Sequence, residues 1–205
     1  MKPVDHGIQG IILAAGASIR MKVHKALLEF DDGSTLLARE AGLLNAAGCV
    51  RIAIVVGFEA DKVKKRHSDL AVTWLNNDEW ELGQFSSIQL GLAWALEIGS
   101  SGVLIQPVDS LASSFSTARS LIETAIINQH VDAIIPEHDG SGGHPVYISK
   151  QMALELIKLD PRKADSRLDR QLSFSKKVLR FPVNDPGILK NINTPEDWVS
   201  VTSDQ

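Results

Sequence analysis

The sequence predicts an α/β fold of three layers, α/β/α, built on a Rossmann-like, mostly parallel twisted sheet. Short runs rich in β-branched residues alternate with longer stretches of helical periodicity along the chain. The first run, at residues 10–14, is continuously apolar, which is typical of a strand buried on both faces. The 205 residues are expected to form a single domain, residues 1–205.

In the first half of the chain, turn and cap residues separate the predicted elements. Ser34 and Thr35 are expected to open a helix, and Gly48 follows it where a C-terminal cap belongs. Gly57 leads into a basic helix, and Asn76-Asn77 close a third strand. The expected strands are residues 10–14, 51–56 and 72–75, and the expected helices are residues 36–47 and 61–66.

The second half continues the alternation. Ser86 or Ser87 is expected to cap a helix that runs to about residue 98 and, being apolar almost all round, is deeply buried. Thr194 and Pro195 are expected at the N-cap and first position of the last helix. The polar segment 160–170 has no clear assignment and is a candidate lid. The remaining expected strands are residues 103–107, 133–136, 144–148 and 178–182, and the remaining helices are residues 118–126 and 151–158.

Composition restricts the class of protein. The net charge of −4 and the pI of about 5.8 argue against a nucleic-acid surface held by bulk charge. No apolar run approaches the roughly 20 residues that span a bilayer, and MKPVDHGIQG does not resemble an export signal. Cys49 is the single cysteine and allows no internal disulfide. We therefore expect a cytoplasmic protein with neither a membrane nor a nucleic-acid partner.

The loop after the first strand is the leading candidate for a phosphate site. Small residues, Ala14 to Ser18, leave the backbone N–H groups accessible, and Arg20 and Lys25 add positive charge. The loop lacks both G-x-G-x-x-G and G-K-[ST], which counts against a dehydrogenase or methyltransferase and against a P-loop. In a doubly wound sheet, this loop and those after residues 56, 75, 107 and 136 share one rim. The pattern favours a nucleoside triphosphate, although a plain tight turn remains the alternative.

Polar residues at later strand ends are candidates for a metal and for a second substrate. Asp109, after an apolar strand, suits Mg²⁺, which prefers carboxylate oxygen; its alternative role is a cap or turn residue. Asn191 and Asn193 are possible second ligands or, equally, turn residues. His144 is expected to shape an acceptor pocket, together with segment 160–170. The six histidines include no H-x-x-x-H pair and predict no zinc site.

Five ordered motifs together resemble the nucleotidyltransferase family that includes molybdenum cofactor cytidylyltransferases and guanylyltransferases, the MobA-like NTP transferases. LAAGASIRMKVHKALL resembles the family's L-A-A-G-x-S-x-R-M-G-x-x-K-x-L-L signature, and NNDEWELGQFSSIQLGL resembles a segment of its cytidylyltransferase branch. QPVDS, GGHPVYIS and NINTPEDW occupy the positions of its aspartate, G-H-P-V and closing motifs. The resemblance covers nearly the whole chain.

This resemblance implies Mg²⁺-dependent transfer of a nucleoside monophosphate, CMP rather than GMP because Ala15 replaces a guanylyl-branch glycine. The acceptor is a phosphorylated small molecule such as molybdopterin, and pyrophosphate is released. The implied catalytic residues are Lys25, Arg20 and Asp109, and the implied metal ligands are Asp109 and Asn193. The nucleotide is expected to contact Leu13, Ala14, Ala15, Gly16, Ala17, Ser18, Arg20, Lys25, Ser86 and Ser87, and the acceptor Gly143, His144 and Pro145.

Several positions depart from the family pattern. Lys22 replaces the signature glycine, Ser110-Leu111 replace a usual D-x-P continuation, and asparagines stand at 191 and 193 where the cytidylyltransferase branch often has aspartates. Only Arg167 matches the branch's G-D-x-G-A-R segment. These departures leave two alternatives, an NTP-binding regulatory module without catalysis and a sugar-phosphate nucleotidyltransferase. The acceptor and the oligomeric state stay open.

Overall fold

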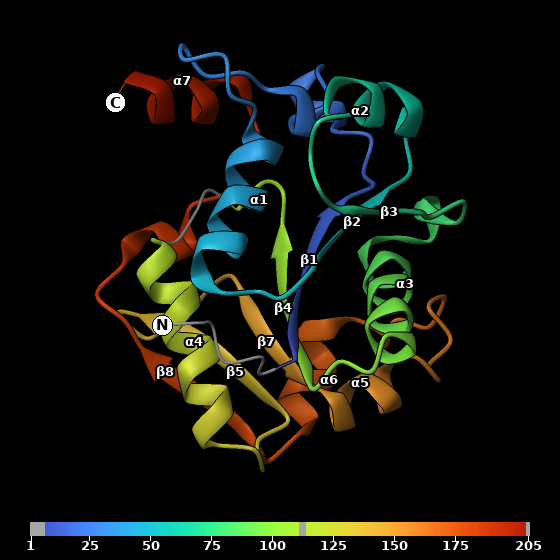
Figure 1. The fold of residues 1–205 in the computed structure, drawn as a ribbon, viewed down its shortest axis with the longest axis vertical. Coiled ribbons are helices and arrows are strands. Elements are labelled where there is room, and N and C mark those ends of the chain that lie inside the picture. The colour runs from blue at the N-terminus through green and yellow to red at the C-terminus, as the bar shows by residue number, and fades with distance from the viewer. Residues whose placement is uncertain (1–6, 111–113, 204–205) are drawn as a thin grey trace.

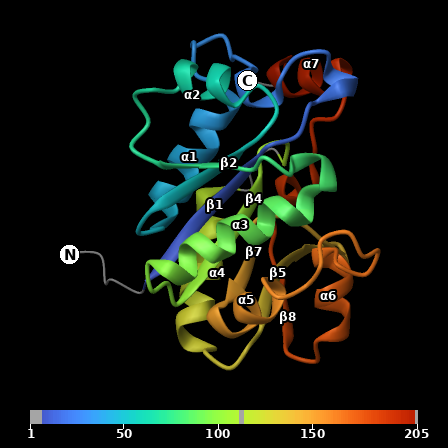
Figure 2. The same ribbon diagram turned by 90° about the vertical axis from the view of Figure 1, so that its right-hand side faces the viewer.

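A mixed sheet crosses the molecule and carries helices on both faces (Figures 1 and 2). The computed structural model describes residues 7–110 and 114–203. Leu111 and residues 1–6, which contributed to the expectations above, lie outside the described residues. The strand order is β3-β2-β1-β4-β7-β5-β6, with β8 paired to β5. The three-layer α/β/α prediction is confirmed.

Four parallel strands form one half of the sheet, and these are β1 (Ile8–Ala14), β2 (Ile52–Val56), β3 (Thr73–Asn76) and β4 (Gly102–Pro107). In the other half, β7 (Val146–Ser149) runs antiparallel to both β4 and β5 (Ala133–His138). Strands β6 (Ser141–Gly142) and β8 (Val178–Pro182) pair with β5, the second in parallel. All five predicted rim loops therefore leave the sheet at one edge.

Seven α-helices are described, and they are α1 (Leu36–Ala47), α2 (Ala60–Arg66), α3 (Gln84–Glu97), α4 (Phe115–Ile127), α5 (Lys150–Leu156), α6 (Leu168–Phe174) and α7 (Pro195–Ser203). Side chains cap several of them as the sequence predicts. Thr35 Oγ1 accepts from the N–H of Ala38 at 3.1 Å, and Thr194 Oγ1 accepts from that of Asp197 at 3.3 Å. Both caps satisfy an amide that lacks a partner inside its helix.

Side chains of β1 divide the interior into two cores, one on each face of the sheet. Ile12 and Ala14 point into the core shared with α1 and α4, whereas Ile11 and Leu13 point into the core shared with α3 and α5. Gly91 lets α3 approach β1 closely, because a Cβ there would lie 2.7 Å from Ile11 Cγ2. The continuous apolar run of β1 is thus the consequence of burial on both faces.

The beginning and the burial of α3 differ from the prediction. Neither Ser86 nor Ser87 is its cap: the helix begins at Gln84 after Gly83, and both serines are buried in its first turn. Only one face of α3 is buried, since Gln84, Ala93 and Glu97 are exposed. The helix covers the sheet from one side, and its outer face is exposed although the helix is largely apolar.

Segment 160–170 consists of turns followed by the start of α6, a helix that the sequence pattern did not reveal. Leu172 is its one buried residue, so α6 has too few apolar positions to show helical periodicity. No helix in the described ranges is long and apolar enough to span a bilayer.

Candidate active site

The loop that follows β1 lies at the carboxyl edge of the parallel strands. Ser18 adopts the left-handed conformation (φ 52°), and a short 3-10 helix, Ile19–Met21, follows. Among the described residues, the N–H groups of Gly16, Ala17 and Ser18 have no protein acceptor. Ser18 Oγ accepts from the backbone N–H of Lys25 at 3.1 Å, which joins the two ends of the loop. Such a concave backbone with free amides binds anions.

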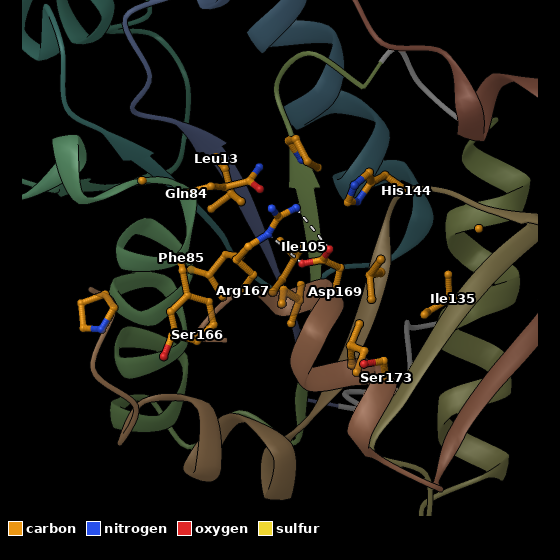
Figure 3. A pocket seen from close by; sticks show the side chains of 18 of the residues that line it. Leu13, Gln84, Phe85, Ile105, Ile135, His144, Ser166, Arg167, Asp169 and Ser173 are labelled. Carbon is orange, nitrogen blue, oxygen red and sulfur yellow. Dashed lines mark hydrogen bonds and ion pairs between the residues drawn. The ribbon is translucent and has the colours of Figure 1, made fainter. Parts of the chain in front are cut away.

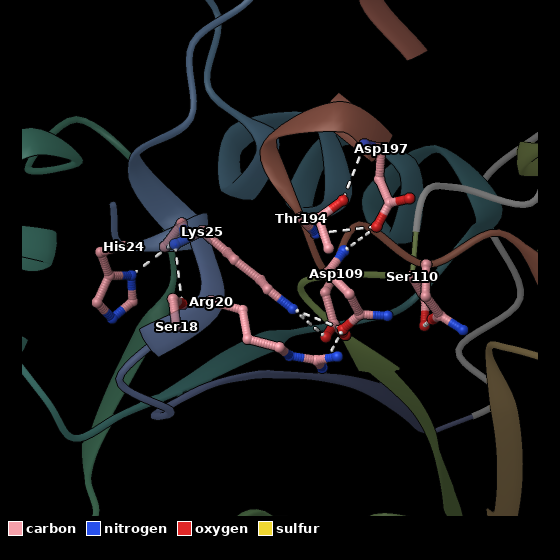
Figure 4. Close-up of polar contacts among 11 residues, drawn as sticks. Ser18, Arg20, His24, Lys25, Asp109, Ser110, Thr194 and Asp197 are labelled. Carbon is pink, nitrogen blue, oxygen red and sulfur yellow. Dashed lines mark hydrogen bonds and ion pairs between the residues drawn. The ribbon is translucent and has the colours of Figure 1, made fainter. Parts of the chain in front are cut away.

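Two cations, a carboxylate and an amide converge beside this loop (Figure 4). Lys25 Nζ donates to Asp109 Oδ2 at 2.8 Å and to Asn193 Oδ1 at 3.1 Å. Arg20 Nη2 donates to the same Asn193 oxygen at 3.1 Å. The Lys25 side chain is 11% exposed and that of Asp109 31%. Residues from three distant parts of the sequence therefore form one partly desolvated charge cluster.

The two candidate asparagines have different surroundings. Asn191 Oδ1 accepts from Ser110 Oγ at 2.8 Å, within a short antiparallel bridge between these residues. The backbone N–H of Asn193 instead donates to Asp197 Oδ2 at 2.8 Å, which turns the Asn193 side chain toward Lys25. The hydrogen bonds from Asn193 and Thr194 lower the pKa of Asp197. Asp197 stays ionised in the first turn of α7, where a negative charge stabilises the helix.

The oxygen ligands of this cluster suit a divalent cation only in part. No three histidine, cysteine, aspartate or glutamate side chains come together as a metal site in the part of the chain that is described. Asp109 and Asn193 offer one carboxylate and one amide oxygen. Mg²⁺ usually takes one or two carboxylates together with substrate phosphates. The residues therefore fit Mg²⁺ only when a nucleotide supplies the remaining oxygens.

Two cavities follow the loop. One, of about 320 Å³, is lined by Leu13, Ala14, Ala15, Gly16, Ser18, Lys25, Ser87 and Asp109, among others. The second, of about 530 Å³, is lined by Ala17, Ser18, Ile19, Arg20, Lys25, Trp80, Asp109 and Asn193. The structure thus brings together all but one of the residues predicted to contact the nucleotide. The exception is Ser86, which lines neither cavity.

A third and larger cavity, of about 920 Å³, adjoins the first through the shared lining residues Leu13, Gly83, Gln84 and Pro107 (Figure 3). Gly143 and His144 line it, as do residues of segment 160–170; Pro145 is buried behind a cis peptide bond and does not line it. Burial lowers the pKa of His144, against the opposing effect of Asp109. His144 is therefore neutral at pH 7.

Asn77 is a residue of this site whose role the sequence reasoning missed. Its Nδ2 donates to Ser86 Oγ and to Ser87 Oγ, each at 2.9 Å, and its Oδ1 accepts from the N–H of Glu79. Asn77 thereby fixes the hydroxyl of Ser87 at the smaller cavity. Asn77 is buried, and these hydrogen bonds satisfy its side-chain amide.

Trp80 and Lys22 differ in their position relative to these cavities. Trp80 lines both smaller cavities and packs edge-on against Phe58, with ring centroids 5.7 Å apart. Gly57 permits this position, since a Cβ there would lie 2.7 Å from Trp80 Cβ. Lys22 is exposed, lines none of the three cavities and adopts φ 58°.

Comparison with known proteins identifies the family and supports the fold. Residues 10–177 match the model of the MobA-like NTP transferase domain. Molybdenum cofactor cytidylyltransferase of Escherichia coli (strain K12) is 23% identical over 195 residues, 94% of each chain. A nucleotidyl transferase structure from Methanothermobacter has a TM-score of 0.79 at 22% identity, covering 96% of both chains.

A Mycobacterium tuberculosis structure in complex with manganese has a TM-score of 0.75 at 19% identity, covering 97% of this chain and all of that one (100%). At these identities the solved structures establish the fold, whereas the family model covers most of the chain. The chain therefore belongs to the MobA-like NTP transferases, a family of nucleotidyltransferases.

Proposed function

We propose that this protein transfers CMP from CTP to a phosphorylated small-molecule acceptor such as molybdopterin and releases pyrophosphate. The observation that carries the proposal is the cluster of Lys25, Arg20, Asp109 and Asn193 beside a loop with free amides. This cluster adjoins the large cavity, which has room for an acceptor. The name of the Escherichia coli relative, a molybdenum cofactor cytidylyltransferase, supports the choice of cytidine and of an acceptor of this kind.

Charge neutralisation is the main catalytic contribution of these side chains. A triphosphate seated on the loop would accept from the N–H groups of residues 16–18 and approach Lys25 and Arg20. Lys25 is largely shielded from water, so its charge acts on phosphate oxygens with little solvent screening. Negative charge that develops on the leaving pyrophosphate is stabilised by the same cations.

The acceptor phosphate attacks the α-phosphorus in line, forming a new P–O bond as the bond to pyrophosphate breaks. An anionic phosphate oxygen is already a nucleophile, so the reaction needs positioning more than a general base. Neutral His144 in the large cavity can hydrogen-bond the acceptor without adding charge. Mg²⁺, held by Asp109 and Asn193 together with phosphates, would supply Lewis-acid stabilisation of those oxygens.

A thermal-shift panel tests the nucleotide. CTP, GTP, UTP, ATP and dTTP are compared, each with Mg²⁺ and with EDTA. CTP with Mg²⁺ should raise the melting temperature most, because binding to the folded state alone stabilises it. A larger shift with GTP would overturn the base assignment. Equal shifts with Mg²⁺ and with EDTA would mean that nucleotide binding does not depend on the metal.

Two substitutions test the catalytic cluster. Asp109→Ala and Lys25→Ala should each reduce pyrophosphate release by about 10²-fold or more, the scale seen when a transition-state contact is removed. Asp109→Asn, which preserves shape, is the matched control for packing and should be nearly as inactive. Circular dichroism should show an unchanged fold. Full activity in either alanine variant contradicts the mechanism.

The thermal shift and the pyrophosphate assay together distinguish the proposed activity from an alternative function. A nucleotide-binding module without catalysis would show the CTP shift with wild-type protein but no pyrophosphate release with molybdopterin. The substitution of aspartates by Asn191 and Asn193 motivates this alternative, because an amide oxygen binds Mg²⁺ more weakly than a carboxylate.

A further inference from the structure

An ion pair lies inside the large cavity. Arg167 Nε donates to Asp169 Oδ1 at 3.1 Å, and Arg167 Nη2 donates to Asp169 Oδ2 at 3.2 Å (Figure 3). Both residues line the cavity, and their side chains are 71% and 63% exposed. The carboxylate thus occupies the Nε/Nη2 edge of the guanidinium in a bidentate geometry by which arginine also binds phosphate.

The charges around this pair are otherwise positive. Three cationic side chains line the cavity, those of Lys163, Arg167 and Arg180, whereas Asp169 is the one acidic residue among the described lining residues. Arg180 is partly engaged by Glu137 at 3.4 Å, outside the lining. The remaining lining residues are mostly apolar, including Leu13, Phe85 and Ile105. Asp169 is therefore the group that cancels the charge available to an anionic ligand.

We propose that Arg167 binds an anionic group of the acceptor and that Asp169 is an internal substitute for this group, displaced when the acceptor enters. This inference rests on the function proposed above, because it takes the large cavity to be the acceptor site. An exposed ion pair contributes little net stability, so exchanging its carboxylate for a phosphate or carboxylate of the ligand is inexpensive.

A purely structural role for Asp169 fits the contacts less well. An aspartate in the first turn of a helix ordinarily serves the free N–H groups there. Helix α6 begins with Arg167 as its N-cap and has no side-chain cap hydrogen bond. Both carboxylate oxygens of Asp169 instead accept from Arg167.

The same segment contains a matched control pair. Arg170 Nε lies 3.9 Å from Asp165 Oδ1, with side chains 60% and 72% exposed. Neither of these residues lines the cavity. Asp165→Asn removes the same charge from the same segment without altering the proposed subsite.

Steady-state kinetics with CTP and molybdopterin test the exchange. Asp169→Asn should lower the KM for the acceptor by about two- to fivefold, the scale of a surface ion pair, and Arg167→Gln should raise it by about tenfold or more. Neither should change the KM for CTP. In Arg167→Gln protein, adding Asp169→Asn should give no further change. An effect of Asp169→Asn that persists without Arg167, or that Asp165→Asn reproduces, overturns the proposal.

A binding measurement keeps the inference separate from turnover. Inorganic phosphate is titrated into ¹⁵N-labelled protein, and the Nε–H signal of Arg167, assigned with Arg167→Lys, is followed. The signal should shift on saturation, at a phosphate concentration about two- to fivefold lower in Asp169→Asn. Loss of turnover with this shift preserved would overturn the proposed function alone. No shift of the Arg167 signal would overturn the exchange.

Discussion

At the scale of single residues, Lys22 carries backbone strain in the loop beside the charge cluster. Its φ of 58° lies in the left-handed region, where a Cβ costs roughly 1 kcal/mol. The resemblance to the family predicted a glycine at this position, and the conformation supplies the physical reason. Because the side chain is exposed and lines no described cavity, its charge does not offset this cost.

Lys22→Gly should therefore raise the free energy of unfolding by about 1 kcal/mol, measured by urea denaturation. Lys22→Ala is the matched control, since it removes the charge but keeps the Cβ. It should leave stability nearly unchanged. Equal stabilisation by both substitutions would mean that charge, not backbone strain, is responsible.

Residues whose role follows from position along the chain were predictable. Lys25 lies in the loop after the first predicted strand and Asp109 lies just beyond a later one, and parallel strands bring such residues to one edge. Asn77 was not predictable in the same way, because its importance comes from contacts with Ser86 and Ser87 across a turn. Residues that position others leave little trace in a single sequence.

At the scale of elements, α7 connects the charge cluster to the core that is shared with α1 and α4. Asp197 fixes the backbone of Asn193, and Trp198 packs on Phe30 with ring centroids 4.7 Å apart. The Arg39 guanidinium lies 3.4 Å from the centroid of the same Phe30 ring. The position of Asn193 therefore depends on aromatic packing that lies outside the charge cluster.

Trp198→Ala should destabilise the protein by about 2 kcal/mol, since a half-buried aromatic contact is lost. It should also weaken the CTP-dependent thermal shift, because α7 no longer holds Asn193 firmly. Val199→Ala, at an exposed position of the same helix, is the control and should change neither. An unchanged CTP shift in Trp198→Ala would disconnect α7 from the nucleotide site.

Helix α6 shows why some elements escape sequence analysis. Its seven residues bury one side chain, so neither periodicity nor a cap marked it. The long, strongly apolar elements such as β1 and α1 were predicted to within a few residues, because burial dictates their pattern. The residue pattern of a short element in a cavity wall depends on contacts with the ligand as well as on burial in the core.

At the scale of the whole molecule, three histidines couple folding to pH, of which His24 and His67 are buried and His144 is half-buried. Burial is the main cause that lowers the pKa of His24, His67 and His144 below the ordinary value of 6.5. The unfolded chain therefore binds more protons than the folded chain below about pH 6.5. Stability is fully present above that pH and falls as the pH decreases through it.

The free energy of unfolding, from urea titrations between pH 7.5 and 5, should decrease with a slope of up to about 1.4 kcal/mol per pH unit for each histidine. His67→Gln should reduce the slope, because it removes one group whose Nε2 lies 2.7 Å from Thr35 Oγ1. His130→Gln, at an exposed position, is the control. A pH-independent stability would contradict neutral burial of these rings.

The four residues shared by the large cavity and its smaller neighbour, Leu13, Gly83, Gln84 and Pro107, have a consequence for turnover. In the proposed reaction, two molecules bind in adjacent cavities, pyrophosphate leaves, and the nucleotidylated acceptor spans both cavities past these four residues. The product keeps the contacts of its nucleotide part and of its acceptor part at the same time. Because the two parts are covalently linked, binding of one part makes binding of the other nearly intramolecular. The shared residues that align the substrates would thus also hold the product, so an efficient enzyme of this shape needs a step that releases it.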